Sequence, residues 1–189
     1  MKKILITTGG SGGHVVPALN LYEHLRKEYN VKIYTDIRGA KYFPKEIDKT
    51  IFDVKQFSGK YLFPFKLIFL FISFIKSVHH FKKNHFDFVF STGGYMSLPL
   101  VLAAKIFNKK IFLIEPNSII GRSNKFLLRF SHHILCYDRD VFTNGDNKTT
   151  KHSQKAIIIE PILNNCFYSK QNKTETKDDT FRILILGGS

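Results

Sequence analysis

The sequence predicts an α/β fold, a doubly wound and mostly parallel, Rossmann-like sheet. Short runs rich in Ile, Val and Phe recur along the 189 residues, and helical patterns separate several of them. Strands of this composition are typical of parallel sheets whose two faces are covered by helices. Two of the runs end in paired glycines ahead of a further helix, as phosphate-binding turns do. With 43% hydrophobic residues, a chain of this length can bury one substantial core.

The predicted elements follow this alternation in order. Seven apolar runs are expected to form strands, at 2–8, 31–35, 50–54, 86–91, 110–115, 132–138 and 155–161. Four longer stretches have helical character, at 15–28, 62–83, 98–107 and 121–131. A polar stretch at 143–155 is expected to be a surface loop. We predict one domain at 1–168, a linker at 169–180, which has no apolar residue, and the first strand and loop of a truncated second domain at 181–189.

The charge of the chain favours an anionic partner. Lys and Arg total 29 against 15 Asp and Glu, a formal net charge of +14. Nucleic acid, a phosphorylated metabolite and an anionic membrane surface would each fit this surplus. Nucleic-acid binding rests on charge alone, since no module for it is recognised, and we expect no nucleic-acid partner. Cys136 and Cys166 have neither metal-type nor disulfide-type spacing, which favours a reducing cytoplasm, and we expect no metal and no cofactor.

Two glycine-rich loops follow predicted strands. The stretch "TTGGSGGHVVPAL" at 7–19 holds four glycines within five residues, and "FSTGGYMSLPLVLAAK" at 90–105 repeats the design. Glycines allow close approach of the backbone to a ligand, and the start of the following helix favours phosphate. A tight turn without a ligand is the alternative for each loop. Because both loops are expected at the carboxyl edge of one sheet, their co-occurrence favours an extended phosphorylated ligand.

A third loop, "LIEPNSIIGRSNKFLLRF" at 113–130, adds polar side chains at the same edge. Glu115 and Asn117 come just past a strand, and Asn124 lies near the start of a helix. Each is, taken singly, more typical of a cap or a loop hydrogen bond than of a site. Their predicted place beside the glycine loops makes them candidates.

The segments "GGSGGHVVPAL", "STGGYMSLP" and "IEPNSIIGRSNKFLLR" resemble, in order and spacing, the signature stretches of the MurG family, and they span most of residues 4–130. The resemblance implies the N-terminal half of a two-domain GT-B glycosyltransferase. Such an enzyme transfers N-acetylglucosamine from UDP-N-acetylglucosamine to the lipid-linked muramyl-pentapeptide acceptor, lipid I, to form lipid II for peptidoglycan. It acts as a peripheral protein on the cytoplasmic face of the plasma membrane. "FRILILGGS" at 181–189 is similar to the start of the second domain of that family.

The resemblance also implies roles for individual residues. His14 is implied as the catalytic general base for the acceptor hydroxyl, a task that histidine can perform at neutral pH. Capping the loop is the alternative role of His14, and Glu115 is the alternative base. The second glycine loop is implied to hold the acceptor diphosphate, and Asn117 and Ser189 to contact the nucleotide sugar. The full implied set of substrate-binding positions is Ser11, Gly12, Gly13, Gly93, Gly94, Tyr95, Asn117, Asn124 and Ser189.

The sequence departs from the family pattern at two places. Ile114 and Pro116 stand where the family has His and Gln, so two polar side chains are missing beside the site. The family stretch N-P-V-R corresponds to Glu160-Pro161-Ile162-Leu163, in which Leu163 replaces an arginine that contacts the donor. We therefore expect weakened donor binding.

The helix predicted at 62–83 bears on membrane association. Its apolar centre is about half the ~20 residues that a spanning helix needs. At ~100° per residue, one narrow stripe is expected to face the core, namely Phe63, Leu67, Leu70, Phe74 and Phe81. The opposite side is expected to be exposed and to insert shallowly at an anionic bilayer surface; it comprises Phe65, Ile68, Phe69, Ile72, Lys76 and Lys83. Cover by a loop or a partner is the alternative.

From the sequence we therefore expect the acceptor-side half of a MurG-like hexosyltransferase, inactive alone. Its expected partners are the UDP-sugar donor, the lipid-linked acceptor, an anionic membrane surface and a donor domain, which a separate chain could supply. The alternative is a non-catalytic subunit of a split glycosyltransferase that binds the lipid acceptor and recruits its partner to the membrane.

Overall fold

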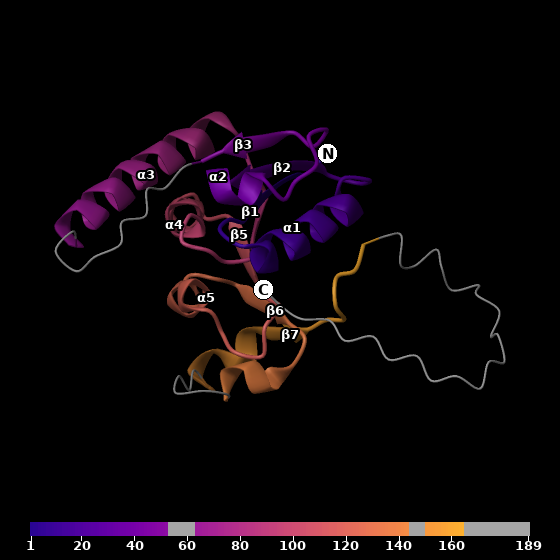
Figure 1. Ribbon diagram of the computed structural model, residues 1–189. Coiled ribbons are helices and arrows are strands. Elements are labelled where there is room, and N and C mark those ends of the chain that lie inside the picture. Colours follow the sequence, from indigo (N-terminus) through magenta and orange to yellow (C-terminus); the bar gives the residue numbers. More distant parts are fainter. Residues whose placement is uncertain (53–62, 144–149, 165–189) are drawn as a thin grey trace.

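The computed structural model describes residues 1–52, 63–143 and 150–164, and it confirms the predicted α/β class (Figure 1). The predicted linker at 169–180 and the predicted second-domain strand at 181–189, with Ser189, lie outside the described residues. The predicted domain boundary at residue 168 lies outside them as well.

The described residues form a sheet of seven strands in the order β3-β2-β1-β4-β5-β6-β7, and every neighbouring pair is parallel. From β1 the chain moves outward to β2 and β3, and then returns to place β4 on the other side of β1. Ligands of open parallel sheets bind where the strand order reverses in this way, which here is between β1 and β4. The strands are β1 (Lys3–Thr7), β2 (Asn30–Thr35), β3 (Lys49–Ile51), β4 (Phe88–Ser91), β5 (Lys110–Glu115), β6 (His133–Cys136) and β7 (Ala156–Ile158).

The helices match the predicted ones, with differences at their ends. They are α1 (Gly12–Leu25), α2 (Ile37–Ala40), α3 (Phe63–Lys83), α4 (Ser97–Ile106) and α5 (Arg122–Leu127), with 3₁₀ turns η1 (Arg139–Phe142) and η2 (Thr150–Lys155). Helix α1 begins before the predicted residue 15, because Ser11 takes the extended conformation of an N-cap and the next two glycines already form the first turn. The single-turn α2 and the 3₁₀ turns are too short for a periodic signal, and the sequence did not predict them.

Successive residues of the strands serve two hydrophobic cores, one on each face of the sheet. Ile4 and Ile6 of β1 pack with Val15 and Ala18 of α1. Leu5, between them, joins the larger core on the opposite face, which α3, α4 and α5 cover. The strands are thus buried on both faces around β1, as their apolar composition predicted.

Helix α3 packs against α4 through a face that is partly small and polar. Ser73, Ser77 and Phe81 are buried on this face, and Leu70 and Phe74 are partly buried against the core. The predicted core stripe is therefore wrong at Leu67, whose exposed fraction is 52%. The stripe is confirmed at Leu70, Phe74 and Phe81, but apolar residues also occur on the exposed side, so their spacing alone could not define the limits of the buried face. The side chain of Phe63 lies outside the described residues.

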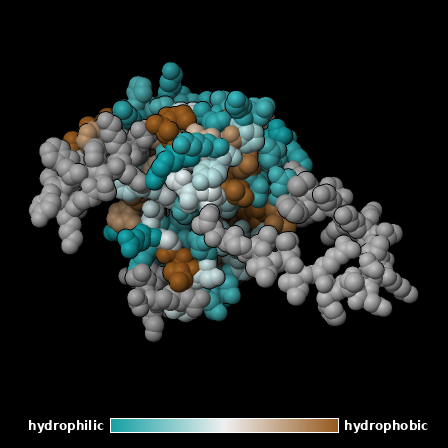
Figure 2. All heavy atoms as spheres, in the orientation of Figure 1, coloured by the Kyte–Doolittle hydropathy of each residue, from teal (hydrophilic) through white to brown (hydrophobic). Residues whose placement is uncertain are grey.

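The opposite side of α3 presents apolar residues at the surface, and Figure 2 shows hydrophobic residues there at the upper left. Phe69 is half-buried, and the side chain of Phe65 lies outside the described residues. Lys76 and Lys83 are exposed. No helix among the described residues combines the length and the apolar character needed to cross a membrane. We call the exposed apolar residues of this helix the outer face of α3; they are Leu67, Ile68, Phe71, Ile72 and Ile75.

Candidate functional site

The two glycine loops meet because the strands before them are neighbours. Thr7 of β1 pairs in register with Ser91 of β4, so both loops begin at the same level of the carboxyl edge. Gly93 and Gly94 have φ of 96° and 87°, a region that favours glycine. A Cβ on Gly94 would lie 2.7 Å from the Gly9 carbonyl oxygen. The second loop can therefore approach the first this closely only with glycine at position 94.

Two buried threonines and His14 tie the loops together. The Thr92 hydroxyl donates to the Thr8 hydroxyl at 2.7 Å, and Thr8 donates in turn to the His14 carbonyl oxygen at 3.0 Å. The His14 ring returns to the second loop, with Nδ1 2.8 Å from the Thr92 carbonyl oxygen. The two bonds between the loops join residues 84 and 78 positions apart in the sequence.

The bond to Thr92 determines the tautomer of His14. A carbonyl oxygen only accepts hydrogen bonds, so Nδ1 must carry the proton and donate it. In the neutral imidazole, Nε2 then keeps its lone pair as an acceptor. His14 therefore has the hydrogen-bonding arrangement of an oriented general base.

His14 lines a cavity of about 260 Å³, which we call the loop cavity. It is bordered by residues from both sides of the β1–β4 switch point and from the start of α5. Those residues are His14, Gly93, Gly94, Gly121, Arg122, Ser123 and Asn124. The exposed side chain of Arg122 adds a cation to the lining.

Glu115 is fully buried beneath this cavity, and both its oxygens accept hydrogen bonds. Oε1 accepts from Asn117, from Nδ2 at 2.8 Å and from the backbone N–H at 3.3 Å. Oε2 accepts from the Gly121 N–H at 2.8 Å and from Asn124 Nδ2 at 3.0 Å. The carboxylate thus holds the turn between β5 and α5 in place.

One polar atom of the Asn124 side chain has no hydrogen-bond partner among the described residues. Its side chain is 1% exposed, and Nδ2 donates to the Ile114 carbonyl oxygen as well as to Glu115. Its Oδ1 is buried and finds no hydrogen-bond partner within the described part of the chain. Because a buried acceptor without a partner is costly, this oxygen is suited to accept from a bound hydroxyl or amide.

The structure brings together only some of the positions implied by the sequence. His14, Gly93, Gly94 and Asn124 border the loop cavity, and Glu115 supports it. The remaining described positions lie outside its lining; these are Ser11, Gly12 and Gly13 at the start of α1, Asn117 beside Glu115, and Tyr95, which packs against the core. Burial raises the pKa of Tyr95.

Sequence reasoning missed several residues that build the site. Asp36, buried at the end of β2, accepts from the Gly10 N–H at 3.0 Å and from the Gly39 N–H at 2.7 Å. Thr8 and Thr92 were also missed, as was Arg122. The available signal was a polar residue directly after a strand; it applies to both threonines and to Asp36, which follows the strand predicted at 31–35.

Two of the positions that depart from the family pattern, Ile114 and Leu163, lie in different surroundings. Ile114 is fully buried in the core. The side chain of Leu163 is 43% exposed, and the segment before it lies against α1, where Asn20 Nδ2 donates to the Ile162 carbonyl oxygen at 2.8 Å.

Comparison with protein families and curated proteins gives a consistent result. Residues 4–136 match the glycosyltransferase family 28 N-terminal domain. The chain is 43% identical to a UDP-N-acetylglucosamine–N-acetylmuramyl-(pentapeptide) pyrophosphoryl-undecaprenol N-acetylglucosamine transferase of Pelagibacter ubique, over 100% of this chain and 52% of the relative. It is 30% identical to a protein of the same name in Rickettsia felis, over 100% of this chain and 53% of that protein. The chain spans about half the length of the curated relatives it matches.

Solved structures agree on the fold. The MurG crystal structure from Acinetobacter baumannii matches with a TM-score of 0.65 at 22% identity, covering 78% of this chain and 44% of that one. A UDP-GlcNAc 2-epimerase from Neisseria meningitidis, bound to UDP-GlcNAc, matches with a TM-score of 0.62 at 14% identity, covering 85% of this chain and 47% of the epimerase.

Proposed function

Because the chain belongs to glycosyltransferase family 28 and its curated relatives are MurG-type transferases, we propose that it is the acceptor-binding half of such an enzyme. The complete enzyme would transfer N-acetylglucosamine from UDP-N-acetylglucosamine to the lipid-linked muramyl-pentapeptide acceptor, lipid I, and release UDP and lipid II. The observation that carries the proposal is His14, oriented by the Thr92 carbonyl oxygen at the border of the loop cavity.

His14 would act as the general base of an inverting displacement. The acceptor hydroxyl attacks the anomeric carbon of the donor sugar while the bond from that carbon to the UDP oxygen breaks. The hydroxyl proton passes to Nε2 of His14, and the positive charge that develops on the ring is supported by the Thr92 carbonyl oxygen at 2.8 Å. UDP departs with the electron pair of the broken bond.

We assign Glu115 a positioning role, although it is the alternative base. Both its oxygens already accept hydrogen bonds, from Asn117, Gly121 and Asn124. To take a proton from the acceptor it would have to give up part of this network, which costs about 1–3 kcal/mol for each donor left unpaired.

The diphosphate of the acceptor would lie against the second glycine loop. Gly93 and Gly94 line the cavity, the N-terminus of α4 follows them, and Arg122 is close by. Backbone N–H groups at the start of a helix and a guanidinium are both suited to phosphate. The spare acceptor on Asn124 would take a hydroxyl or amide proton of the sugar or its substituents.

Most of the donor pocket would come from a second domain, either joined to this chain or supplied by another. Asn117 would contact the nucleotide sugar from this side, as would Ser11, Gly12 and Gly13 of the first loop. With Leu163 in place of the family arginine, we expect donor binding in the assembled enzyme to be weak. This chain alone is expected to have negligible activity.

The decisive measurement is transfer from UDP-N-acetylglucosamine to a lipid I analogue, with this chain alone and with a donor domain added. Transfer is expected only with the donor domain, and its absence there would reject the proposal in favour of a non-catalytic recruiting subunit. In the assembled enzyme, His14→Ala should lower kcat by ~10²-fold or more and remove the acid limb of its pH profile. His85→Ala, at an exposed histidine outside the cavity, is the matched control.

We also propose that the protein is peripheral on the cytoplasmic face of the plasma membrane, bound through the outer face of α3. Five apolar side chains are exposed there, with Lys76 and Lys83 continuing along the helix. Apolar insertion next to cations suits an anionic bilayer surface. Flotation with anionic vesicles should exceed flotation with neutral ones, and equal recovery from both would contradict the electrostatic part of the proposal.

A further inference from the structure

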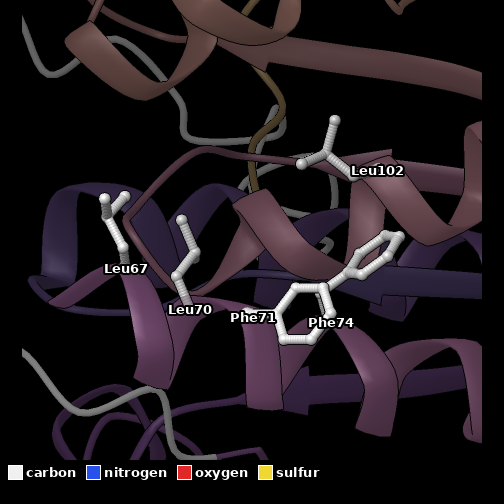
Figure 3. A pocket seen from close by; sticks show the side chains of 5 residues that line it. All are labelled: Leu67, Leu70, Phe71, Phe74 and Leu102. Carbon is white, nitrogen blue, oxygen red and sulfur yellow. The ribbon is translucent and has the colours of Figure 1, made fainter. Parts of the chain in front are cut away.

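A groove between α3 and α4 is lined by hydrocarbon side chains. Its volume is about 430 Å³, within the range of about 300–1,000 Å³ that small-ligand sites occupy. Figure 3 shows the side chains that line it, which are Leu67, Leu70, Phe71 and Phe74 from α3 and Leu102 from α4. None of these side chains has a polar atom. The groove therefore suits a hydrocarbon chain, whereas an extended peptide would leave backbone polar groups unpaired there.

The groove opens onto the outer face of α3. Leu67 and Phe71 belong to both, with exposed fractions of 52% and 62%. Leu70 and Phe74, by contrast, pack against the core and form the deeper wall. A hydrocarbon chain could thus pass from a bilayer on the outer face into the groove along continuous apolar surface.

Helix α4 connects the groove to the second glycine loop. The helix begins at Ser97, directly after the loop that holds Gly93 and Gly94, and Leu102 follows five residues later. At ~1.5 Å per residue, that is ~8 Å of helix axis. A diphosphate at the loop and a chain in the groove would therefore be neighbours on the same helix.

We infer that this groove binds the prenyl units nearest the diphosphate of the lipid acceptor. The inference rests on the proposed function and deepens it, because it assigns the lipid tail a binding site on the protein as well as a place in the bilayer. Binding of the tail would hold the diphosphate against Gly93 and Gly94, so that affinity for the non-reacting tail positions the reacting sugar.

The test is a titration of the 189-residue chain, without membrane or detergent, with soluble prenyl diphosphates of increasing length. Dimethylallyl, geranyl and farnesyl diphosphate are the probes, and inorganic pyrophosphate is the reference. Affinity is expected to rise at least about tenfold from the one-unit to the three-unit chain, because each added unit buries further apolar carbon. Linear dodecyl diphosphate should gain less, since it lacks the branches that a prenyl chain presents.

Two variants test whether the rise in affinity with chain length arises in the groove. Leu102→Trp should fill the groove and abolish the dependence on chain length, while the affinity for pyrophosphate stays unchanged. Phe71→Ala, at a side chain that is 62% exposed and so tolerant of change, should reduce the dependence. Ile106→Trp is the matched control, because Ile106 is on the same helix, is 60% exposed and lies outside the groove lining.

Three results would each overturn the inference: no gain with chain length, the same gain in Leu102→Trp as in the unchanged chain, or an equal gain with the linear chain, which would indicate a general lipid surface. Its failure is separable from failure of the proposed function. If sugar is transferred with a donor domain but affinity does not rise with prenyl chain length, only the inference about the groove is rejected. If affinity rises with chain length but no sugar is transferred, the glycosyltransferase proposal is rejected instead.

Discussion

The carboxyl edge of the sheet and the outer face of α3 differ in how their side chains are fixed. At the edge, directional bonds fix the polar groups: Thr8, Thr92 and His14 bond across the two loops, and Glu115 accepts from three residues. On the outer face, apolar side chains lie 42–62% exposed. We infer that a single substitution at the edge should strongly lower the stability of the fold. At the outer face, a substitution should change stability little but should measurably weaken binding to membranes.

The largest effect is expected for Gly94→Ala. The new side chain would have to take φ of 87°, and its Cβ would lie 2.7 Å from the Gly9 carbonyl oxygen. Strain and backbone collision together should lower the free energy of unfolding by about 3 kcal/mol or more. Urea denaturation measures this change.

Gly13→Ala is the matched control at the same edge. Gly13 is in the first turn of α1, and an added Cβ would meet only Ser11 Oγ at 3.8 Å, an ordinary contact. Alanine is favoured over glycine in helices by up to about 1 kcal/mol, so stability should be unchanged or slightly raised. If Gly94→Ala were as stable as Gly13→Ala, the close approach of the loops would not be required.

A smaller loss at the edge is expected for Glu115→Gln. The amide keeps the size of the carboxyl group but turns one acceptor into a donor, which then faces an N–H of Gly121 or of an asparagine. The free energy of unfolding should fall by about 2 kcal/mol. In the assembled enzyme, kcat should fall less than in His14→Ala, and the acid limb of its pH profile should remain. Loss of that limb would make Glu115 the base. Glu46→Gln, at an exposed carboxylate, is the control.

The edge also separates what sequence can predict from what it cannot. Gly93 and Gly94 follow a strand and precede a helix, a local pattern that predicts a turn of this kind. The bond from Gly10 to Asp36 joins residues that follow two different strands, and the place of Asp36 after its strand does not identify Gly10 as its partner. Such contacts depend on which strands become neighbours in the sheet. No local pattern in a single sequence shows this order.

Helix α3 illustrates the same limit for packing. Its existence and its end at Lys83 agree with the helix predicted at 62–83. The buried side was predicted correctly at Leu70, Phe74 and Phe81. Its extent was not, because Ser73 and Ser77, which are polar, are also buried there. Ser77 satisfies its hydroxyl by donating to the Ser73 carbonyl oxygen at 2.8 Å, so a small polar residue can occupy a close helix contact.

A modest effect that depends on pH is expected where α3 meets the sheet. His80 contacts Tyr34, with Nδ1 3.1 Å from the Tyr34 hydroxyl, and its pKa is lowered by burial and further by His79, Lys83 and Lys32. The unfolded chain therefore binds this proton at higher pH than the folded one does. Stability should fall as pH drops below about 6.5, the usual pKa of histidine, and the loss should be complete below the folded pKa.

His80→Gln should flatten this dependence, since glutamine can still bond to Tyr34 but does not titrate. Urea midpoints at pH 7.5 and 5.5 measure it, and His85→Gln, at an exposed position, should leave the slope unchanged. Part of the slope should persist in His80→Gln, because the pKa of His132 is lowered too, first by burial. A steeper slope in His80→Gln than in the unchanged chain would contradict this assignment.

The smallest effect on the fold is expected on the outer face of α3, for Ile68→Ser combined with Ile72→Ser. These side chains are 54% and 42% exposed, so the free energy of unfolding should change by no more than about 0.5 kcal/mol for each. Binding to anionic vesicles should nevertheless fall at least about tenfold, because full burial of one isoleucine in lipid is worth about 1.5–3 kcal/mol. Ile37→Ser, 56% exposed on α2 and outside the outer face, should leave vesicle binding unchanged. Equal losses in the two variants would mean that exposed apolar area anywhere on the surface mediates adhesion, whereas a loss confined to α3 would show that its outer face is the site of attachment.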